Sequence, residues 1–184
     1  MTHRRLLIAL FGVYLLLLVW IVLWRLEVPY LGGVLREVTL VPFSPGAGGG
    51  VKSPFELAFN VVLFIPFGLY LGLLAPARPW WAHLGVVAGV SLALEVAQYV
   101  LAVGRSDSTD VVLNTAGGLV GLGVAAVARH VSGASAARAM TRACSVATAV
   151  ALVVAGLYLA SPWQPVHGRD VGPLARVDLP RTVP

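Results

Sequence analysis

The sequence predicts an all-α fold, a polytopic bundle of about five transmembrane helices. The 184-residue chain is 58% hydrophobic and only 11% charged, and its mean hydropathy is +0.86. Its apolar residues come in blocks of about 20, the length of helix that crosses a bilayer. This composition indicates an integral membrane protein with one domain and no separate soluble domain.

The expected spans follow the apolar blocks in order. The first block is longer than the core of a signal peptide and has no Ala-x-Ala exit, so it is expected to remain as a membrane helix. A Gly-rich connector, a Pro-containing turn, a short polar loop and a basic linker separate the blocks. Spans are expected at residues 6–24, 54–75, 80–103, 110–129 and 144–160. They form a membrane domain over residues 1–160, and the Pro-rich tail at 161–184 is expected to be irregular or disordered.

The distribution of arginine and lysine predicts the orientation in a bacterial plasma membrane. Short cytoplasmic loops carry an excess of these residues. A cytoplasmic N-terminus would place most of the arginines of the short loops inside, namely Arg4, Arg5, Arg78, Arg129, Arg138 and Arg142. The C-terminus, the connector at 25–54 and the loop at 104–109 then lie outside, although the arginines of the tail argue against this arrangement.

The composition and residue spacing argue against several kinds of site. The net charge is +5, but the arginines are scattered over loops, so they are interpreted as topology signals and contacts for anionic lipids, and no nucleic-acid partner is expected. Cys144 stands alone, which gives no disulfide framework. The histidines do not approach one another in any helical register. A divalent cation between Glu95, Asp107 and Asp110 would suit its preference for carboxylates, but the spacing does not require one, so no metal or other cofactor is predicted.

Two apolar segments share a weak pattern. NVVLFIPFGL at 60–69 and DVVLNTAGGL at 110–119 have VVL and GL at the same offsets, and each begins with a polar residue. The two helices would run in the same direction, as in a parallel internal repeat. Chance matches between apolar segments are common, so a chance match remains the alternative interpretation.

Polar side chains are concentrated on the predicted helix faces near one membrane boundary. Ser91, Glu95 and Gln98 are spaced i, i+4, i+7 and therefore share one helical face. Asp110 and Asn114 share a face of the next span by the same rule. Asn60, in the second span, lies near the same boundary. Because ionisable groups are costly in a bilayer, these faces are expected to turn toward one another.

Several of these residues also have plainly structural interpretations. Asp110 lies at a helix start, where a carboxylate can cap the helix and complement its dipole. Glu95 could form a hydrogen-bonded pair that only locks the helices together. Arg105 follows in the short loop, from which it could neutralise Glu95 or Asp110 or bind a phosphate with its planar guanidinium.

Small residues predict close helix packing. Gly117 and Gly121 form a G-x-x-x-G pattern that lets another helix approach closely, and no strand or lysine accompanies it as a phosphate loop would require. Pro66 is expected to kink the second span and free a carbonyl. The residues assigned to helix packing are Pro66, Gly68, Gly117, Gly118 and Gly121.

These motifs together resemble the VanZ-like membrane proteins. The resemblance covers residues 40 to 125 and includes NVVLFIPFGLYLG, SLALEVAQYVLAVGRSDSTDVVLNTAGGLVG and an earlier LVPF element. The chain departs from the family pattern where Thr109-Asp110 replaces two adjacent acids, which weakens a metal interpretation. The resemblance implies a link to resistance to teicoplanin, a lipoglycopeptide that acts on lipid-linked cell-wall precursors.

Three functions follow as alternatives, and a transporter is a fourth that the small number of spans disfavours. The leading hypothesis is a membrane protein that binds an anionic lipid, a lipid-linked cell-wall precursor or the lipoglycopeptide in an outer-face polar pocket. Its ligand-binding residues would be Asn60, Ser91, Gln98, Arg105 and Asn114. The second is an intramembrane hydrolase or transferase acting on a phosphate-containing lipid, with Glu95 and Asp110 as catalytic carboxylates. The third is a structural or accessory membrane protein. The pattern does not fix an oligomeric state.

Overall fold

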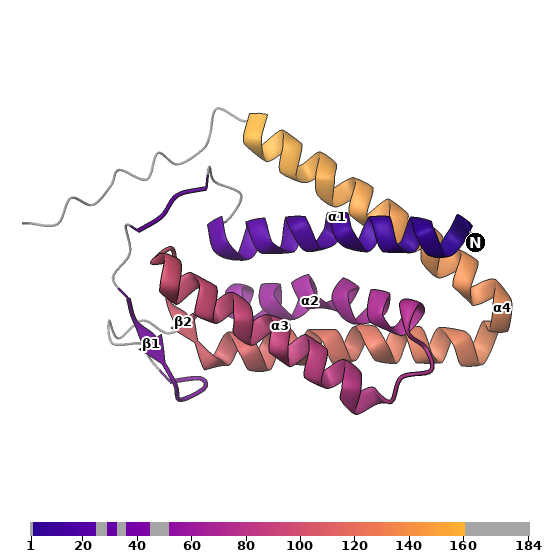
Figure 1. Ribbon diagram of the computed structural model, residues 1–184, viewed down its shortest axis with the longest axis horizontal. Coiled ribbons are helices and arrows are strands. Elements are labelled where there is room, and N and C mark those ends of the chain that lie inside the picture. Colours follow the sequence, from indigo (N-terminus) through magenta and orange to yellow (C-terminus); the bar gives the residue numbers. More distant parts are fainter. Residues whose placement is uncertain (1, 25–28, 33–35, 45–51, 161–184) are drawn as a thin grey trace, which may run out of the picture.

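A computed structural model describes residues 2–24, 29–32, 36–44 and 52–160. The expected disorder of the tail at 161–184 lies outside these residues. The described chain is almost entirely helical, and its helices pack side by side (Figure 1). The elements in chain order are α1 (Thr2–Trp24), β1 (Val38–Thr39), α2 (Pro54–Leu74), α3 (Trp80–Leu101), β2 (Ser106–Asp107) and α4 (Ser108–Ala160).

The predicted all-α, five-span architecture is confirmed. Five helical segments of the described chain are long and apolar enough to cross a membrane. The last two, Ser108–Val131 and Arg138–Leu157, belong to one helix, α4, whereas the sequence predicted two helices joined by a linker. Figure 1 shows α4 bending back on itself between these spans. The intervening segment 132–137 reads SGASAA; alanine favours helix, while Gly and Ser are common where helices bend, so the chain turns without losing its helical path.

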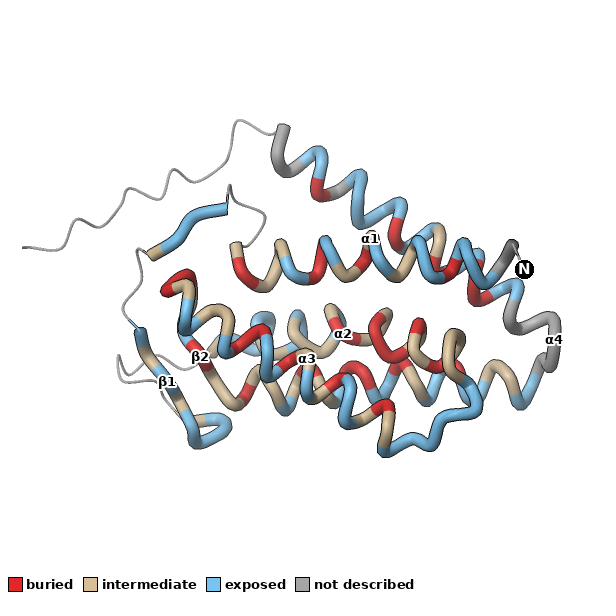
Figure 2. The backbone as a smooth tube through the Cα atoms, viewed as in Figure 1, coloured by how far each residue is buried: buried red, intermediate tan, exposed pale blue. Residues whose placement is uncertain are grey.

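An aromatic core joins α1, α2 and the second span of α4. Many residues on the inward faces of the helices are buried, whereas many on the outward faces are exposed (Figure 2). The ring of Phe11 lies 5.5 Å from that of Phe67 and 5.2 Å from that of Tyr70. The Tyr14 hydroxyl donates to the Leu63 carbonyl at 2.7 Å, and the Tyr70 and Thr148 hydroxyls are 3.0 Å apart. Both buried tyrosine hydroxyls are therefore satisfied, as burial requires.

Glycines set the distance between α2 and α4. A Cβ atom added at Gly117 would meet the carbonyl of Val61, and one at Gly121 would meet the carbonyl of Ile65. The colliding atoms belong to the α2 backbone, which cannot move aside as a flexible side chain could. The two helices therefore pack backbone to backbone along this glycine stripe, as small-residue motifs allow in membranes.

A further glycine pair lies in close contact at the same helix crossing, Gly68 of α2 and Gly118 of α4. A Cβ at Gly68 would meet the Gly118 carbonyl, and a Cβ at Gly118 would meet the Val87 side chain of α3. Gly68 and Gly118 occupy equivalent positions in the two segments that share the weak sequence pattern. Pro66 lies inside α2, two residues before this contact. These close contacts thus fix how far the first turns of α2 lie along the helix axis relative to those of α4.

Residues 36–44, which we term the strap, cover one end of the bundle. Its β1 residues pair in parallel with β2, with Val38 opposite Ser106 and Thr39 opposite Asp107. The Arg36 Nε donates to the carbonyl of Tyr99 at 3.2 Å, near the end of α3. The strap therefore spans the end of α3 and the start of α4, where the polar side chains lie.

Candidate functional site at the strap end of the bundle

One cation bridges two carboxylates at the start of α4. The Lys52 Nζ lies 2.9 Å from Asp107 Oδ2 and 2.5 Å from Asp110 Oδ1. The Asn60 Nδ2 donates to the same Asp110 oxygen at 2.5 Å. We term Lys52, Asn60, Asp107 and Asp110 the ionic cluster. It ties the connector and α2 to the β2–α4 junction.

The position of Lys52 follows from the start of α2. Ser53 caps this helix, because its hydroxyl accepts from the Glu56 N–H at 3.2 Å and the Glu56 carboxylate accepts from the Ser53 N–H at 3.3 Å. This reciprocal capping box fixes the chain direction immediately before Pro54. Sequence reasoning missed Lys52 as a site residue. Two signals could have revealed it: it is the single lysine in the chain, and it directly precedes the Ser-x-x-Glu pattern.

Two members of the ionic cluster, Lys52 and Asp107, lie outside the membrane spans, and their contacts favour the charged form of each. Burial alone would raise the pKa of the Asp107 carboxyl, but hydrogen bonds from Thr109 and Lys52 outweigh burial and lower that pKa. Burial would likewise lower the pKa of Lys52, but the hydrogen bonds to Asp110 and Asp107 raise it. Each charge is thus stabilised by a specific partner and not by exposure to water.

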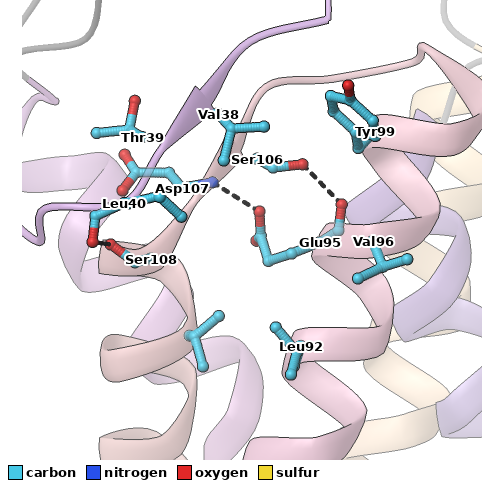
Figure 3. A pocket seen from close by; sticks show the side chains of 11 residues that line it. Val38, Thr39, Leu40, Leu92, Glu95, Val96, Tyr99, Ser106, Asp107 and Ser108 are labelled. Carbon is cyan, nitrogen blue, oxygen red and sulfur yellow. Dashed lines mark hydrogen bonds between the residues drawn. The ribbon is translucent and has the colours of Figure 1, made fainter.

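Glu95 lies behind β2 and not against lipid. Its side chain is only 5% exposed, and its Oε2 accepts from the Asp107 N–H at 2.8 Å. Its backbone carbonyl accepts from the Ser106 hydroxyl at 2.7 Å, as Figure 3 shows. Glu95 therefore holds β2 in place while Asp107 reaches toward Lys52.

The other polar residues of the α3 face turn to different partners. Ser91 Oγ accepts from Asn114 Nδ2 at 2.9 Å, which links α3 to α4. Gln98 Nε2 donates to the Val22 carbonyl of α1 at 2.8 Å. The remaining side-chain oxygens of Asn114 and Gln98 are buried and have no hydrogen-bond partner among the described residues. The predicted site residues thus share one end of the bundle but do not form a single network.

Arg105 does not neutralise Glu95 or Asp110, contrary to one sequence-based expectation. Its side chain is 63% exposed, and its Nη1 lies 3.8 Å from Glu37 Oε2, a loose ion pair. The physical reason is that Ser106 is buried with its hydroxyl on the Glu95 carbonyl, which leaves the preceding residue of the chain, Arg105, at the surface. Lys52, and not Arg105, is the cation that pairs with Asp110, while Glu95 accepts from a backbone amide.

A groove of about 300 Å³ opens beside Glu95 (Figure 3). One wall comes from β1 and the following residue, the other from α3, and the floor from β2 and the start of α4. Glu95 is the polar exception on the α3 wall, which otherwise presents an aliphatic and aromatic surface. The lining residues are Val38, Thr39, Leu40, Leu92, Glu95, Val96, Tyr99, Ser106, Asp107, Ser108 and Val111.

The carboxylates are already engaged by protein groups. Lys52 lies between Asp107 and Asp110, where a divalent cation would need to bind, and Glu95 accepts from a backbone amide. Among the residues that the structure describes, no group of three histidine, cysteine, aspartate or glutamate side chains could hold a metal ion.

Comparison with known proteins identifies the family. The family model described as VanZ/LLP1 matches residues 11–129, a range that contains the ionic cluster and the groove. Protein VanZ of Enterococcus faecium is 36% identical over 117 residues, which is 62% of this chain and 70% of that relative. No solved structure matches the chain. The chain is therefore a multi-pass membrane protein of the VanZ-like family, the family that its motifs link to teicoplanin resistance.

Proposed function

We propose that this protein binds an anionic lipid, or a lipid-linked cell-envelope precursor, at the strap end of its helix bundle. The observation that carries the proposal is the groove beside Glu95, an apolar trough with a few polar lining residues, one of which, Ser106, directly follows the exposed Arg105. Ligand sites in proteins commonly combine an apolar lining with a few placed polar groups. The arrangement suits a molecule with a hydrocarbon chain and a charged headgroup.

The hydrocarbon chain would lie against α3. Leu92 and Val96 are more than half exposed on the outer face of this span and line the groove. A chain lying along them would replace the lipid that otherwise contacts them. Because the groove opens on a lipid-facing helix surface, the ligand can enter sideways from the bilayer.

The headgroup would lie at Arg105. Its guanidinium is exposed and only loosely paired with Glu37, so it is available to a phosphate. Arginine presents a planar fork of N–H donors that matches phosphate oxygens. Arg105 directly precedes Ser106, a groove residue, so its charge would lie near the mouth of the trough.

The remaining predicted ligand-binding residues would act from behind the groove. Asn60, Ser91 and Gln98 have protein partners that fix α2, α3 and α1 around the site. The unpartnered oxygens of Asn114 and Gln98 would accept hydrogen bonds from water or from a hydroxyl of the ligand. The site residues would thus be held in position by rigid helices, as a selective site requires.

The proposed location is the outer face of the bacterial plasma membrane. A cytoplasmic N-terminus would place the arginines of the α2–α3 turn and of the α4 bend inside, in keeping with the positive-inside rule. The strap, the groove and the ionic cluster would then face outward. At that face the protein would meet lipid-linked cell-wall precursors, which would connect the site to the family's link with teicoplanin.

One observation favours an intramembrane enzyme instead. The Glu95 carboxyl lines the groove, where it would act as a general acid or base on a phosphate-containing lipid. Asp110, the predicted second catalytic carboxylate, does not line the groove and is paired with Lys52 and Asn60. The pairing of Asp110 supports a binding protein over an enzyme.

Replacement of Arg105 tests the proposal. The Arg105→Ala variant is expected to lose at least about tenfold in the occupancy of copurified anionic lipid, since a charge-assisted phosphate contact contributes about 1.5–3 kcal/mol. Native mass spectrometry of the detergent-extracted protein measures which lipids remain bound. Arg78→Ala is the matched control, because Arg78 is an exposed arginine at the opposite end of the bundle. Equal lipid loss in the two variants would count against a headgroup site at Arg105.

A further inference from the structure

The turn at the tip of the strap presents an apolar surface that extends beyond the proposed lipid site, which it meets at Leu40. Leu40, Val41 and Phe43 are 79%, 65% and 62% exposed, and Pro42 between them is exposed as well. We term residues 40–43 the apex. Four consecutive exposed apolar residues suggest a partner, since such patches mark interaction surfaces.

The apex is held outward by specific contacts. The Phe43 N–H donates to the Thr109 hydroxyl at 2.9 Å, and the Ser108 hydroxyl donates to the Leu40 carbonyl at 2.9 Å. Phe43 has a φ of 60°, a left-handed conformation that is unfavourable for an aromatic residue. Such strain persists only where surrounding contacts impose it. The apolar side chains therefore point away from the bundle because of the way the strap is anchored.

The anchoring contacts also fix the depth of the apex in the membrane. Ser108 is the first residue of the span Ser108–Val131, and Thr109 is the second. The backbone of Leu40 and that of Phe43 lie within hydrogen-bond distance of these side chains. The apex is therefore level with a membrane boundary, where apolar side chains can insert between headgroups.

The apex is continuous with the lipid-facing surface of α3. Leu40 lines the groove together with Val96 and Tyr99, and Tyr99 and Val96 are both exposed on a membrane span. An exposed tyrosine at the end of a span is typical of the aromatic belt at the membrane interface. A single surface thus leads from the lipid-facing side of α3 to the apex.

We propose that the apex inserts into the interfacial layer of the same bilayer that the helices span. Its partner is the boundary between the phospholipid headgroups and the acyl chains. Insertion anchors the strap, which forms one wall of the groove, at the surface of the leaflet from which a lipid would enter. The inference concerns the strap and does not depend on which ligand the groove binds.

Spin labelling with power-saturation spectroscopy tests the insertion. Val41→Cys and Phe43→Cys are made separately with Cys144→Ala, labelled with a nitroxide, and reconstituted as full chains in vesicles of phosphatidylcholine and phosphatidylglycerol. The label at Val62→Cys, on the exposed face of α2, provides the lipid reference. The label at Ala77→Cys, in the exposed α2–α3 turn, provides the aqueous reference.

The expected result is a severalfold higher ratio of oxygen to nickel-chelate collisions at positions 41 and 43 than at position 77. A ratio equal to that at position 77 would overturn the inference, because the apex would then lie in water. Suppressed collisions with both reagents would also overturn it, since the apex would then be covered by protein, including a second copy. Arg105→Ala is expected to leave the ratio unchanged, which separates this result from failure of the headgroup site.

A second measurement avoids replacement of the buried Cys144. Benzoylphenylalanine is placed at position 43 of the otherwise unaltered chain, which is reconstituted in nanodiscs of the same lipids and irradiated. The expected adduct has the mass of one phospholipid. An adduct with a second protein chain would contradict insertion. So would the absence of any lipid adduct at position 43 when the same probe at position 62 does form one.

Discussion

Alanine in place of Gly121 is expected to destabilise the protein by about 3 kcal/mol or more, the upper range for overpacking a tight core. A Cβ at this position would meet the carbonyl of Ile65 and lie 2.7 Å from the backbone nitrogen of Leu69. Both atoms belong to the α2 backbone, so the helices must separate. Separation would also loosen Asn60 from Asp110, because the same crossing sets their depth.

Gly123→Ala is the matched control for this prediction. Gly123 lies two residues further along α4, and a Cβ there would meet nothing within 4 Å. The two substitutions change the same residue type in the same helix, so they share any effect of helix propensity. We expect Gly123→Ala to leave the melting temperature in detergent nearly unchanged. A similar loss of melting temperature in both variants would mean that the close α2–α4 approach does not stabilise the fold.

Replacement of Lys52 by methionine is expected to cost about 2 kcal/mol or more, because removing one partner of a partly buried ion pair leaves the other charges uncompensated. Lys52 is the cation that contacts both Asp107 and Asp110. Arg105→Met removes the same charge from a loose, exposed pair, so it should cost only about 0–1 kcal/mol. Chemical denaturation of both variants in the same detergent gives the comparison.

Two further measurements distinguish a loss of ionic contacts from a loss of packing in Lys52→Met. Adding Asp107→Asn and Asp110→Asn should restore much of the lost stability, since no carboxylate then lacks a partner. In this triple variant, the part of the stability that depends on the titration of the cluster should also disappear. In the unaltered chain, the Asp107 contribution is present above the usual aspartate pKa of about 4 and is lost as the pH falls through its lowered value. The Lys52 contribution is present below the usual lysine pKa of about 10.4 and is lost as the pH rises through its raised value.

The helical architecture was predictable because hydropathy alone determines it. A bilayer requires blocks of about 20 apolar residues in helical form, and the five blocks could be found by reading along the chain. The bend within α4 was not predictable in this way. The segment at 132–137 is polar enough to suggest a linker, yet its alanines keep it helical.

The candidate site was predictable only in part, for a physical reason. Helical periodicity shows which residues share a face, and it grouped Ser91, Glu95 and Gln98 correctly on α3. It cannot show which partner a side chain meets across a connector with no regular period. The pairing of Lys52 with two carboxylates, and of Arg105 with Glu37, depends on the capping of α2 and the pairing of β1 with β2.

The position of a bound lipid chain tests the central proposal most directly. An anionic phospholipid with a photoreactive diazirine in its acyl chain is mixed into vesicles with the full-length protein, irradiated, and mapped by peptide mass spectrometry. A lipid in the groove predicts adducts concentrated on Leu92, Val96 and Tyr99 and reduced by Arg105→Ala. Adducts spread evenly over equally exposed positions such as Val62 and Val124, and insensitive to Arg105→Ala, would contradict a lipid site beside Glu95.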